Sequence, residues 1–287
     1  MLDFIYAHNE SLIKNVSKPI IEQEQNTNLI LTNNCLSQLD IIGKPGCLCD
    51  ILNNCITAIG KRYFKRVITN PTTDTNHLIQ MYERTQKIID NNQYKFVRKR
   101  LQNVHDIERI INRTQIHPHN WSTLYASLVE IQNFNDINIS KCISDIENSF
   151  DIVKTSKYNI STIDENIFNE VYNRDLDDLQ RNSNEICSYF KNLHETISTY
   201  IRLENNDKDG LVFVTTSKKF QDLLKSATCP KFFKSFKSTK YKQNHIKVYT
   251  EETDNKNNEY LEIRESIRIR VAEEFNNYCK QFIDKYS

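Results

Sequence analysis

Glycine and proline are scarce in this chain of 287 residues, which contains four glycines and five prolines. Sandwiches and doubly wound sheets use many more glycine turns, so this scarcity favours long helices over a strand-and-turn fold. A phosphate-binding loop is also excluded, because it needs the spacing Gly-x-x-x-x-Gly-Lys-Ser/Thr and the glycines, at positions 43, 46, 60 and 210, do not provide it. We therefore expect no ATP site in this sequence and no nucleotide hydrolysis by it.

Long apolar runs and metal-binding patterns are absent too. No stretch approaches the roughly 18 apolar residues that a membrane-spanning helix needs. The eight cysteines are irregularly spaced, and only Cys47 and Cys49 lie close together, without a second Cys or His pair at the spacing of zinc sites. Since no signal peptide is recognisable either, we expect reduced thiols, no metal site and no membrane partner.

Charge is balanced in total and uneven along the chain. The 38 basic and 37 acidic residues give a net charge of +1. Between Lys218 and Lys247, however, nine lysines accompany a single acidic residue, Asp222, and six carboxylates follow between residues 251 and 265. Such a run of lysines is either a solvated surface that keeps the protein soluble or a site for the phosphates of nucleic acid.

The most constrained segment runs from Cys55 to Pro71. Asn70-Pro71 ends it, because the residue before proline is pushed out of the helical region. Gly60 interrupts its apolar face; glycine in a helix costs roughly 1 kcal/mol relative to alanine, so we expect a neighbouring element that approaches too closely for a side chain. The pattern predicts a buried hinge helix, or simply an amphipathic core helix, whose apolar residues are Ile56, Ile59, Tyr63, Phe64 and Val67.

The segments around this helix carry a resemblance to a known family. They are residues 29–42, 47–52, 78–84 and 106–113, and in this order and at these spacings they resemble the core (lever) domain of the MutS mismatch-repair family. The sequences Asn-Asn-Cys-Leu-Ser-Gln-Leu-Asp and Leu-Asn-Asn-Cys are most similar to those of the MutS branch found in giant viruses and octocoral mitochondria. The residues on the family's recurrent positions are Thr57, Gly60, Lys61, Arg62, Pro71, Arg84, Asp106, Glu108, Arg109 and Arg113.

A second landmark lies at residues 168–179. It is similar to the family segment that opens the long helix leading away from the core, although Val171 replaces the usual glycine. The apolar period continues to Ile201 and predicts a helix of about thirty residues. Residues 211–216 and 245–250 are predicted to be strands. The aromatic residues between them are expected to form a small core. Residues from Glu259 onward are predicted to form a returning helix.

The resemblance implies a mainly α fold, in which a long-helix MutS core (lever) domain carries a small inserted α+β clamp. The implied limits are 1–24 for the end of the connector and the helix that enters the core, 25–190 for the core domain, 191–258 for the clamp and 259–287 for the returning core helix. No nucleophile or metal ligand accompanies the recurrent residues, so we expect no catalytic residue. A structural role is expected for Thr57, Gly60, Arg62, Pro71, Asp106 and Arg109.

The resemblance also implies a function. The clamp would grip the backbone of double-stranded DNA independently of sequence, through Lys218, Lys219, Lys231, Lys234, Lys237, Lys240, Lys242 and Lys247. The lever would couple this grip to an ATPase domain absent from this chain, where a complete family member would bind ATP and Mg and form a homodimer. No cofactor is expected in this chain itself.

A repair role would place the protein in a reducing compartment that contains DNA, such as a viral factory, nucleus or mitochondrion. The alternative is a standalone helical scaffold that binds nucleic acid or proteins without a role in repair.

Overall fold

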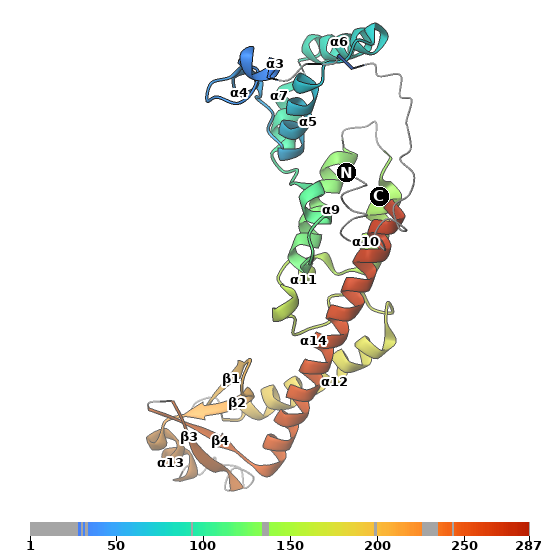
Figure 1. The fold of residues 1–287 in the computed structure, drawn as a ribbon. Coiled ribbons are helices and arrows are strands. Elements are labelled where there is room, and N and C mark those ends of the chain that lie inside the picture. Colours follow the sequence, from blue (N-terminus) through green and yellow to red (C-terminus); the bar gives the residue numbers. More distant parts are fainter. Residues whose placement is uncertain are drawn as a thin grey trace, which may run out of the picture. The chain divides into compact units, whose positions relative to one another are not determined.

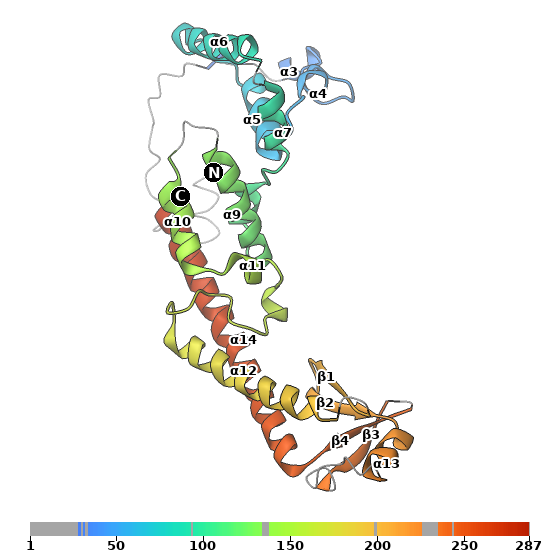
Figure 2. The ribbon, with the colours of Figure 1, turned by 180° about the vertical axis from the view of Figure 1, so that it is seen from behind.

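The computed structural model describes residues 28–29, 31, 34–92, 94–133, 138–197, 200–225, 235–242 and 244–286 (Figures 1 and 2). The chain divides into two units, Met1–Phe96 and Val97–Ser287. Helices dominate both units, and the strands of the second unit form one small four-stranded antiparallel sheet. The predicted fold class, mainly α with a small inserted α+β part, is confirmed.

The first unit is built from short and medium helices, two of which, α5 and α6, begin at side-chain caps. Thr57 Oγ1 accepts a hydrogen bond from the Gly60 amide at 3.0 Å, and Asp74 Oδ1 accepts one from the His77 amide at 3.1 Å. The described elements are α3 (Cys35–Gln38), α4 (Leu48–Leu52), α5 (Ala58–Thr69), α6 (Thr75–Asp90) and α7 (Tyr94–Leu101), whose last residues belong to the second unit.

Helix α5 forms where it was predicted, but its predicted burial is wrong. In the part of the chain that the structure describes, no residue of α5 is buried, and Tyr63 is 48% exposed. The expected close neighbour of Gly60 is also different: a Cβ there would lie 2.9 Å from Oγ1 of Thr57 and 3.4 Å from Cβ of Cys55. The helix's own cap fills that space, not another element. The helical periodicity of a sequence shows which side of a helix is apolar. It does not show whether another element packs against that side, and burial depends on that packing.

The core of the second unit surrounds Trp121, the only tryptophan of the chain. Trp121 is fully buried on α9 (Pro118–Gln132), and its ring centroid lies 5.0 Å from that of Phe282 and 6.1 Å from that of Phe275. Both partners belong to the long C-terminal helix α14 (Glu251–Tyr286). The other elements around this core are α8 (Ile107–Ile111), α10 (Ser140–Ser149), α11 (Ile152–Thr155) and the 3₁₀ turn η1 (Ile160–Thr162).

Two helices connect this core to the sheet. Helix α12 (Arg174–Glu195) packs against α14, so the predicted outgoing and returning helices do lie together. Their bounds differ from the prediction: α12 ends at Glu195 before the predicted Ile201, and α14 begins at Glu251 ahead of the predicted Glu259. Thr250 starts α14 early, because its Oγ1 accepts a hydrogen bond from the Thr253 amide at 3.1 Å.

The sheet and one helix form the part that we call the clamp. Its strands lie in the order β1-β2-β4-β3, and every described pair is antiparallel. Phe213 of β2 faces Leu203 of β1 and Val248 of β4, and the core beneath them includes Phe220 and Phe236 as predicted. The elements are β1 (Arg202–Asn206), β2 (Gly210–Thr215), α13 (Ser217–Lys225), β3 (Lys237–Lys242) and β4 (His245–Tyr249).

Side chains of α14 hold the β1–β2 turn in place. Asn257 is buried; its Nδ2 donates to the Asp209 carbonyl at 2.8 Å, and its Oδ1 accepts from the Leu211 amide at 2.7 Å. Arg264 Nη1 donates to the Asn206 carbonyl at 3.1 Å, and Arg264 also pairs with Asp207. The clamp sheet is therefore fixed to α14 by hydrogen bonds as well as by apolar packing.

Val171 is held in a left-handed conformation, with φ +75°, at the position where the family's usual glycine was expected. A β-branched residue there costs about 1–2 kcal/mol, and 78% exposure means that the side chain gains little from burial. Val171→Gly should therefore raise the free energy of unfolding by about 0.5–1 kcal/mol, once the extra entropy of unfolded glycine is subtracted. Urea unfolding measures the change. Val171→Ala keeps the strained Cβ, so the free energy of unfolding should change little. A glycine variant that is less stable than the parent chain would contradict the strained left-handed conformation at Val171.

The C-terminal end of α14 is tied to α10 through Asp145. Lys285 Nζ lies 2.5 Å from Asp145 Oδ2, and the Tyr286 hydroxyl donates to the same oxygen at 2.6 Å. These hydrogen bonds, that of Lys285 first, hold the pKa of Asp145 below its ordinary value. A lowered carboxyl pKa stabilises the fold at pH values above the unfolded pKa, and this stabilisation is lost as the pH falls through the folded pKa.

Asp145→Asn should consequently lower the melting temperature at pH 7 by about 2 °C, since the pair is partly exposed. The difference from the parent chain should shrink towards pH 3, because below the unfolded pKa of the carboxyl the charge of Asp145 contributes progressively less to stability. Thermal unfolding followed by circular dichroism measures it at both pH values. A difference that is the same at pH 7 and pH 3 would show that the charge of Asp145 contributes nothing.

Candidate nucleic-acid interface

The predicted phosphate-binding lysines are distributed over three elements of the clamp and a segment outside the described residues. Lys218 and Lys219 are exposed on α13, and Lys237 and Lys240 are exposed on β3. The remaining four are Lys242 at the end of β3, Lys247 on β4, and Lys231 and Lys234, which lie outside the described residues.

The lysines of β3 lie on an edge strand of the clamp sheet. In the ladder, Lys237 is opposite Tyr249 and Lys240 is opposite Ile246. Lysine on an edge strand also prevents two sheets from joining edge to edge, so edge protection alone would account for these two. It does not account for Lys218 and Lys219, which lie on a helix. Positive charge on both elements fits a surface for phosphates better than it fits edge protection.

Lys247 differs from the exposed lysines. Its ammonium lies 3.7 Å from Asp254 Oδ1 and 5.9 Å from the ring centroid of Tyr249, and the side chain is only 23% exposed. A nearby carboxylate neutralises part of the charge that a phosphate would otherwise meet. We therefore expect Lys247 to contribute less to anion binding than Lys237 or Lys240.

Two basic residues near this surface were not singled out from the sequence. Arg202 is the first residue of β1, and His245 is the first residue of β4. Both are exposed, and both line a small cavity together with Lys219. The sequence placed His245 at the start of a predicted strand, but it gave no such signal for Arg202, because β1 was not predicted. The strand pairing that brings the two residues together is not local.

Comparison with known proteins decides the family. The family model for MutS domain III matches residues 26–286 of this chain. The chain belongs to the MutS domain III family. It is 28% identical over 270 residues to a mutS homolog of DNA mismatch repair from Acanthamoeba polyphaga mimivirus, which covers 78% of this chain and 24% of the relative. It is 37% identical over 111 residues to the mitochondrial DNA mismatch repair protein mutS homolog of Sarcophyton glaucum, which covers 34% of this chain and 11% of the relative.

These two relatives confirm the resemblance to the giant-virus and octocoral mitochondrial branch. The bacterial DNA mismatch repair protein MutS of Fusobacterium nucleatum subsp. nucleatum is also similar, with 26% identity over 189 residues that cover 59% of this chain and 20% of the relative. This MutS domain III chain spans about a quarter or less of the length of these curated relatives. The matched region is domain III, so the match supplies no ATPase domain.

Three of the recurrent positions of this MutS domain III chain make backbone contacts at a helix start or in a loop. Thr57 caps α5 at the Gly60 amide, and Asp106 Oδ1 caps α8 by accepting from the Arg109 amide at 3.2 Å. The Pro71 carbonyl accepts a hydrogen bond from the Leu29 amide at 2.8 Å. These contacts organise the backbone.

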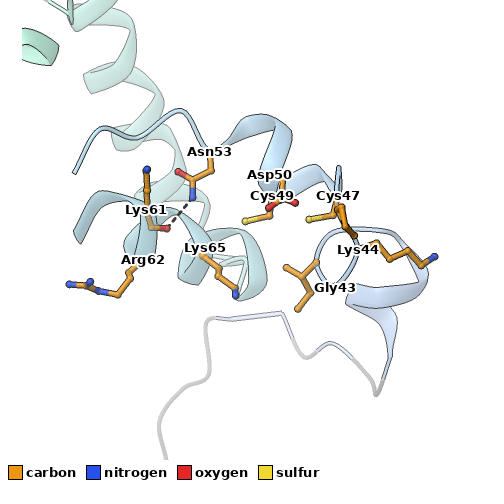
Figure 3. A pocket seen from close by; sticks show the side chains of 11 residues that line it. Gly43, Lys44, Cys47, Cys49, Asp50, Asn53, Lys61, Arg62 and Lys65 are labelled. Atoms are coloured by element: carbon orange, nitrogen blue, oxygen red, sulfur yellow. Dashed lines mark hydrogen bonds between the residues drawn. The ribbon is translucent and has the colours of Figure 1, made fainter. Parts of the chain in front are cut away.

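A hollow of about 580 Å³ lies in the first unit between α5 and residues 42–53 (Figure 3). Lys61, Arg62 and Lys65 line it from α5, and the buried residues Cys47 and Cys49 line it from the other side. Asn53 also lines the hollow, and its side-chain amide donates a hydrogen bond to the Lys61 carbonyl at 3.2 Å (Figure 3). The cationic side of α5 is thus a second basic surface, in a different unit from the clamp.

Neither a metal-binding cluster nor a membrane-spanning helix occurs in the described ranges of the chain. Within them, no group of three or more His, Cys, Asp or Glu residues could hold a metal ion. Within the same ranges, no helix combines the length and the apolar character that crossing a membrane requires.

Proposed function

We propose that this chain is the lever and clamp portion of a MutS-like DNA mismatch-repair protein. The clamp grips the duplex backbone, and α14 transmits the grip to an ATPase domain that this chain does not supply. The observation that carries the proposal is the exposed positive charge on α13 and β3, on a sheet whose β1–β2 turn is hydrogen-bonded to α14. Phosphate binding requires little more than such charge on an accessible surface.

The proposal includes the domain limits and the roles that the family resemblance implies. Residues 25–190 and 259–287 act as the lever, and residues 191–258 act as the clamp. The eight lysines are the contacts to double-stranded DNA, with Lys247 the weakest of the described ones. ATP, Mg and homodimer formation belong to the ATPase domain of the complete protein, and the protein acts in a compartment that contains DNA.

A second candidate function is that of an interaction scaffold. Helix α6 favours it, because Ile79 and Tyr82 are 54% and 68% exposed, and exposed apolar side chains gathered on one helix mark surfaces that bind proteins. This function needs no DNA, so DNA binding separates the two candidates.

Charge reversal at Lys237 and Lys240 tests the grip. The double variant Lys237→Glu/Lys240→Glu should weaken binding to every duplex sequence alike, by about tenfold or more, and should make the dependence on salt shallower by about one unit of log-log slope for each lost phosphate contact. Fluorescence anisotropy with labelled duplexes of two sequences measures both quantities.

The matched control is Lys61→Glu/Lys65→Glu on α5, which makes the same change in net charge at exposed positions of the first unit. This control should leave the salt slope unchanged. Equal loss in both variants would show that only net charge matters. A larger loss in the α5 variant would place the DNA site on the first unit.

A further inference from the structure

Four element ends meet at one end of the clamp sheet. Strand β1 begins at Arg202, β2 ends at Thr215, and β4 begins at His245. Helix α13 begins at Ser217, separated from β2 only by Thr216. The register fixes this convergence, because Arg202 is opposite Val214 and Thr215 is opposite Ile246. Residues far apart in the sequence are therefore brought to the same place by strand pairing.

A cavity of about 130 Å³ lies at this end of the sheet. Among the described residues, its lining includes three basic side chains, those of Arg202, Lys219 and His245, and no acidic one. Sites for nucleotides and other cofactors are usually about 300–1,000 Å³, so this cavity is too small for them. Its size and charge suit one phosphate group.

The start of α13 adds to the attraction for an anion. The helix has nine residues and follows Thr216, whose Oγ1 accepts from the Lys219 amide at 3.4 Å and whose carbonyl accepts from the Phe220 amide at 3.0 Å. The first amides of a helix have no intrahelical acceptor, and the helix dipole places partial positive charge there. Such ends bind phosphate readily when cationic side chains accompany them.

The walls of the cavity are held before any ligand arrives. Thr215 is buried, and its hydroxyl donates to the Tyr200 carbonyl at 2.6 Å, which joins the end of β2 to the residues that precede β1. Tyr200 and Thr215 both line the cavity. A preformed site loses less entropy on binding than flexible surface lysines do.

We propose that this cavity, lined by Arg202, Lys219, His245 and Thr216 at the start of α13, seats a single phosphate group of the nucleic-acid backbone. It is a fixed anchor, whereas Lys237 and Lys240 on β3 supply mobile positive charge. The inference rests on the proposed function, since the phosphate comes from bound DNA. The same chemistry would accept free inorganic phosphate, so the test separates the two sources.

The test compares two double variants that each remove two positive charges. Arg202→Gln/Lys219→Gln alters the cavity, and Lys208→Gln/Lys225→Gln alters exposed lysines of the clamp that do not line it. Titration with inorganic phosphate is followed in the full chain by the amide NMR shifts of Ser217 and Lys218, the first two residues of α13, which are unchanged in every variant. Duplex affinity is followed by fluorescence anisotropy.

Phosphate should shift these amide signals in the parent and in the control variant, but not in the cavity variant. Duplex affinity should fall about tenfold in the cavity variant and about threefold or less in the control variant. Absence of shifts in the parent would overturn the anchor, while DNA binding that depends on Lys237 and Lys240 would leave the proposed function intact. Phosphate shifts with equal affinity losses in both variants would show a site for free phosphate only and would also overturn the anchor. Phosphate shifts in a parent chain that binds no duplex would overturn the anchor together with the proposed function.

Discussion

Trp121→Ala should lower the free energy of unfolding of the second unit by about 3–5 kcal/mol. The side chain is fully buried among the rings of Phe150, Phe275 and Phe282, with centroid distances of 6.2, 6.1 and 5.0 Å. Alanine removes this apolar contact and leaves a cavity that packed helices fill only in part. Urea unfolding followed by far-ultraviolet circular dichroism measures the loss, because the variant has no tryptophan for fluorescence.

Trp121→Phe is the control for this prediction. The Nε1 of Trp121 is buried without a hydrogen-bond partner among the described residues, so phenylalanine removes a donor that gains nothing from the fold. The phenylalanine variant should therefore lose less than half as much stability as the alanine variant. An alanine variant that loses less than about 1 kcal/mol would show that the ring cluster is not the centre of this core.

Gly210→Ala should lower the free energy of unfolding by about 3 kcal/mol. Gly210 has φ +69°, which costs a residue with a side chain about 1–2 kcal/mol. An added Cβ would also lie 2.5 Å from Asn257 Oδ1 and 3.1 Å from the Leu261 side chain. The buried Asn257 would have to give up its hydrogen bond with the Leu211 amide, at a further cost of about 1–3 kcal/mol.

Gly46→Ala separates the two causes. Gly46 has a similar φ, +80°, but no atom lies within 4 Å of an added Cβ, so its variant should lose only the backbone part, about 1–2 kcal/mol. Chemical unfolding of both variants, each compared with the parent, gives the difference. Equal costs at the two glycines would mean that Asn257 moves freely and does not hold the clamp sheet to α14.

The helices could be predicted because their signal is local. Periodicity located α5 and α12, and in the structure the cap residues Thr57, Asp74 and Asp106 mark where helices begin. The burial of α5 could not be predicted, because an apolar stripe does not say what covers it. Strands β2 and β4 were predicted from their β-branched and aromatic residues. Strands β1 and β3 were not, since Arg-Leu-Glu-Asn-Asn and Lys-Ser-Thr-Lys-Tyr-Lys become strands only by pairing with distant partners.

The same limit applies to the candidate site. The excess of lysine between residues 218 and 247 is visible in the sequence, because composition needs no fold. The pairing of Lys247 with Asp254, and the meeting of Arg202 with His245, depend on the turn into α14 and on strand register. The replacement of the family's usual glycine by Val171 was visible in the sequence, but no backbone conformation was predicted from it, and the left-handed φ of +75° is known only from the structure.

The salt dependence of duplex affinity tests the central claim, that the clamp grips DNA through its phosphates. The measurement is fluorescence anisotropy of the whole chain with duplexes of two unrelated sequences, between about 50 and 200 mM salt. If three or four lysines meet phosphates, the logarithm of affinity should fall against the logarithm of salt with a slope near −3, at about −0.9 per phosphate, and the two sequences should give the same line. No binding at about 50 mM salt, or binding that salt does not weaken, would contradict the claim.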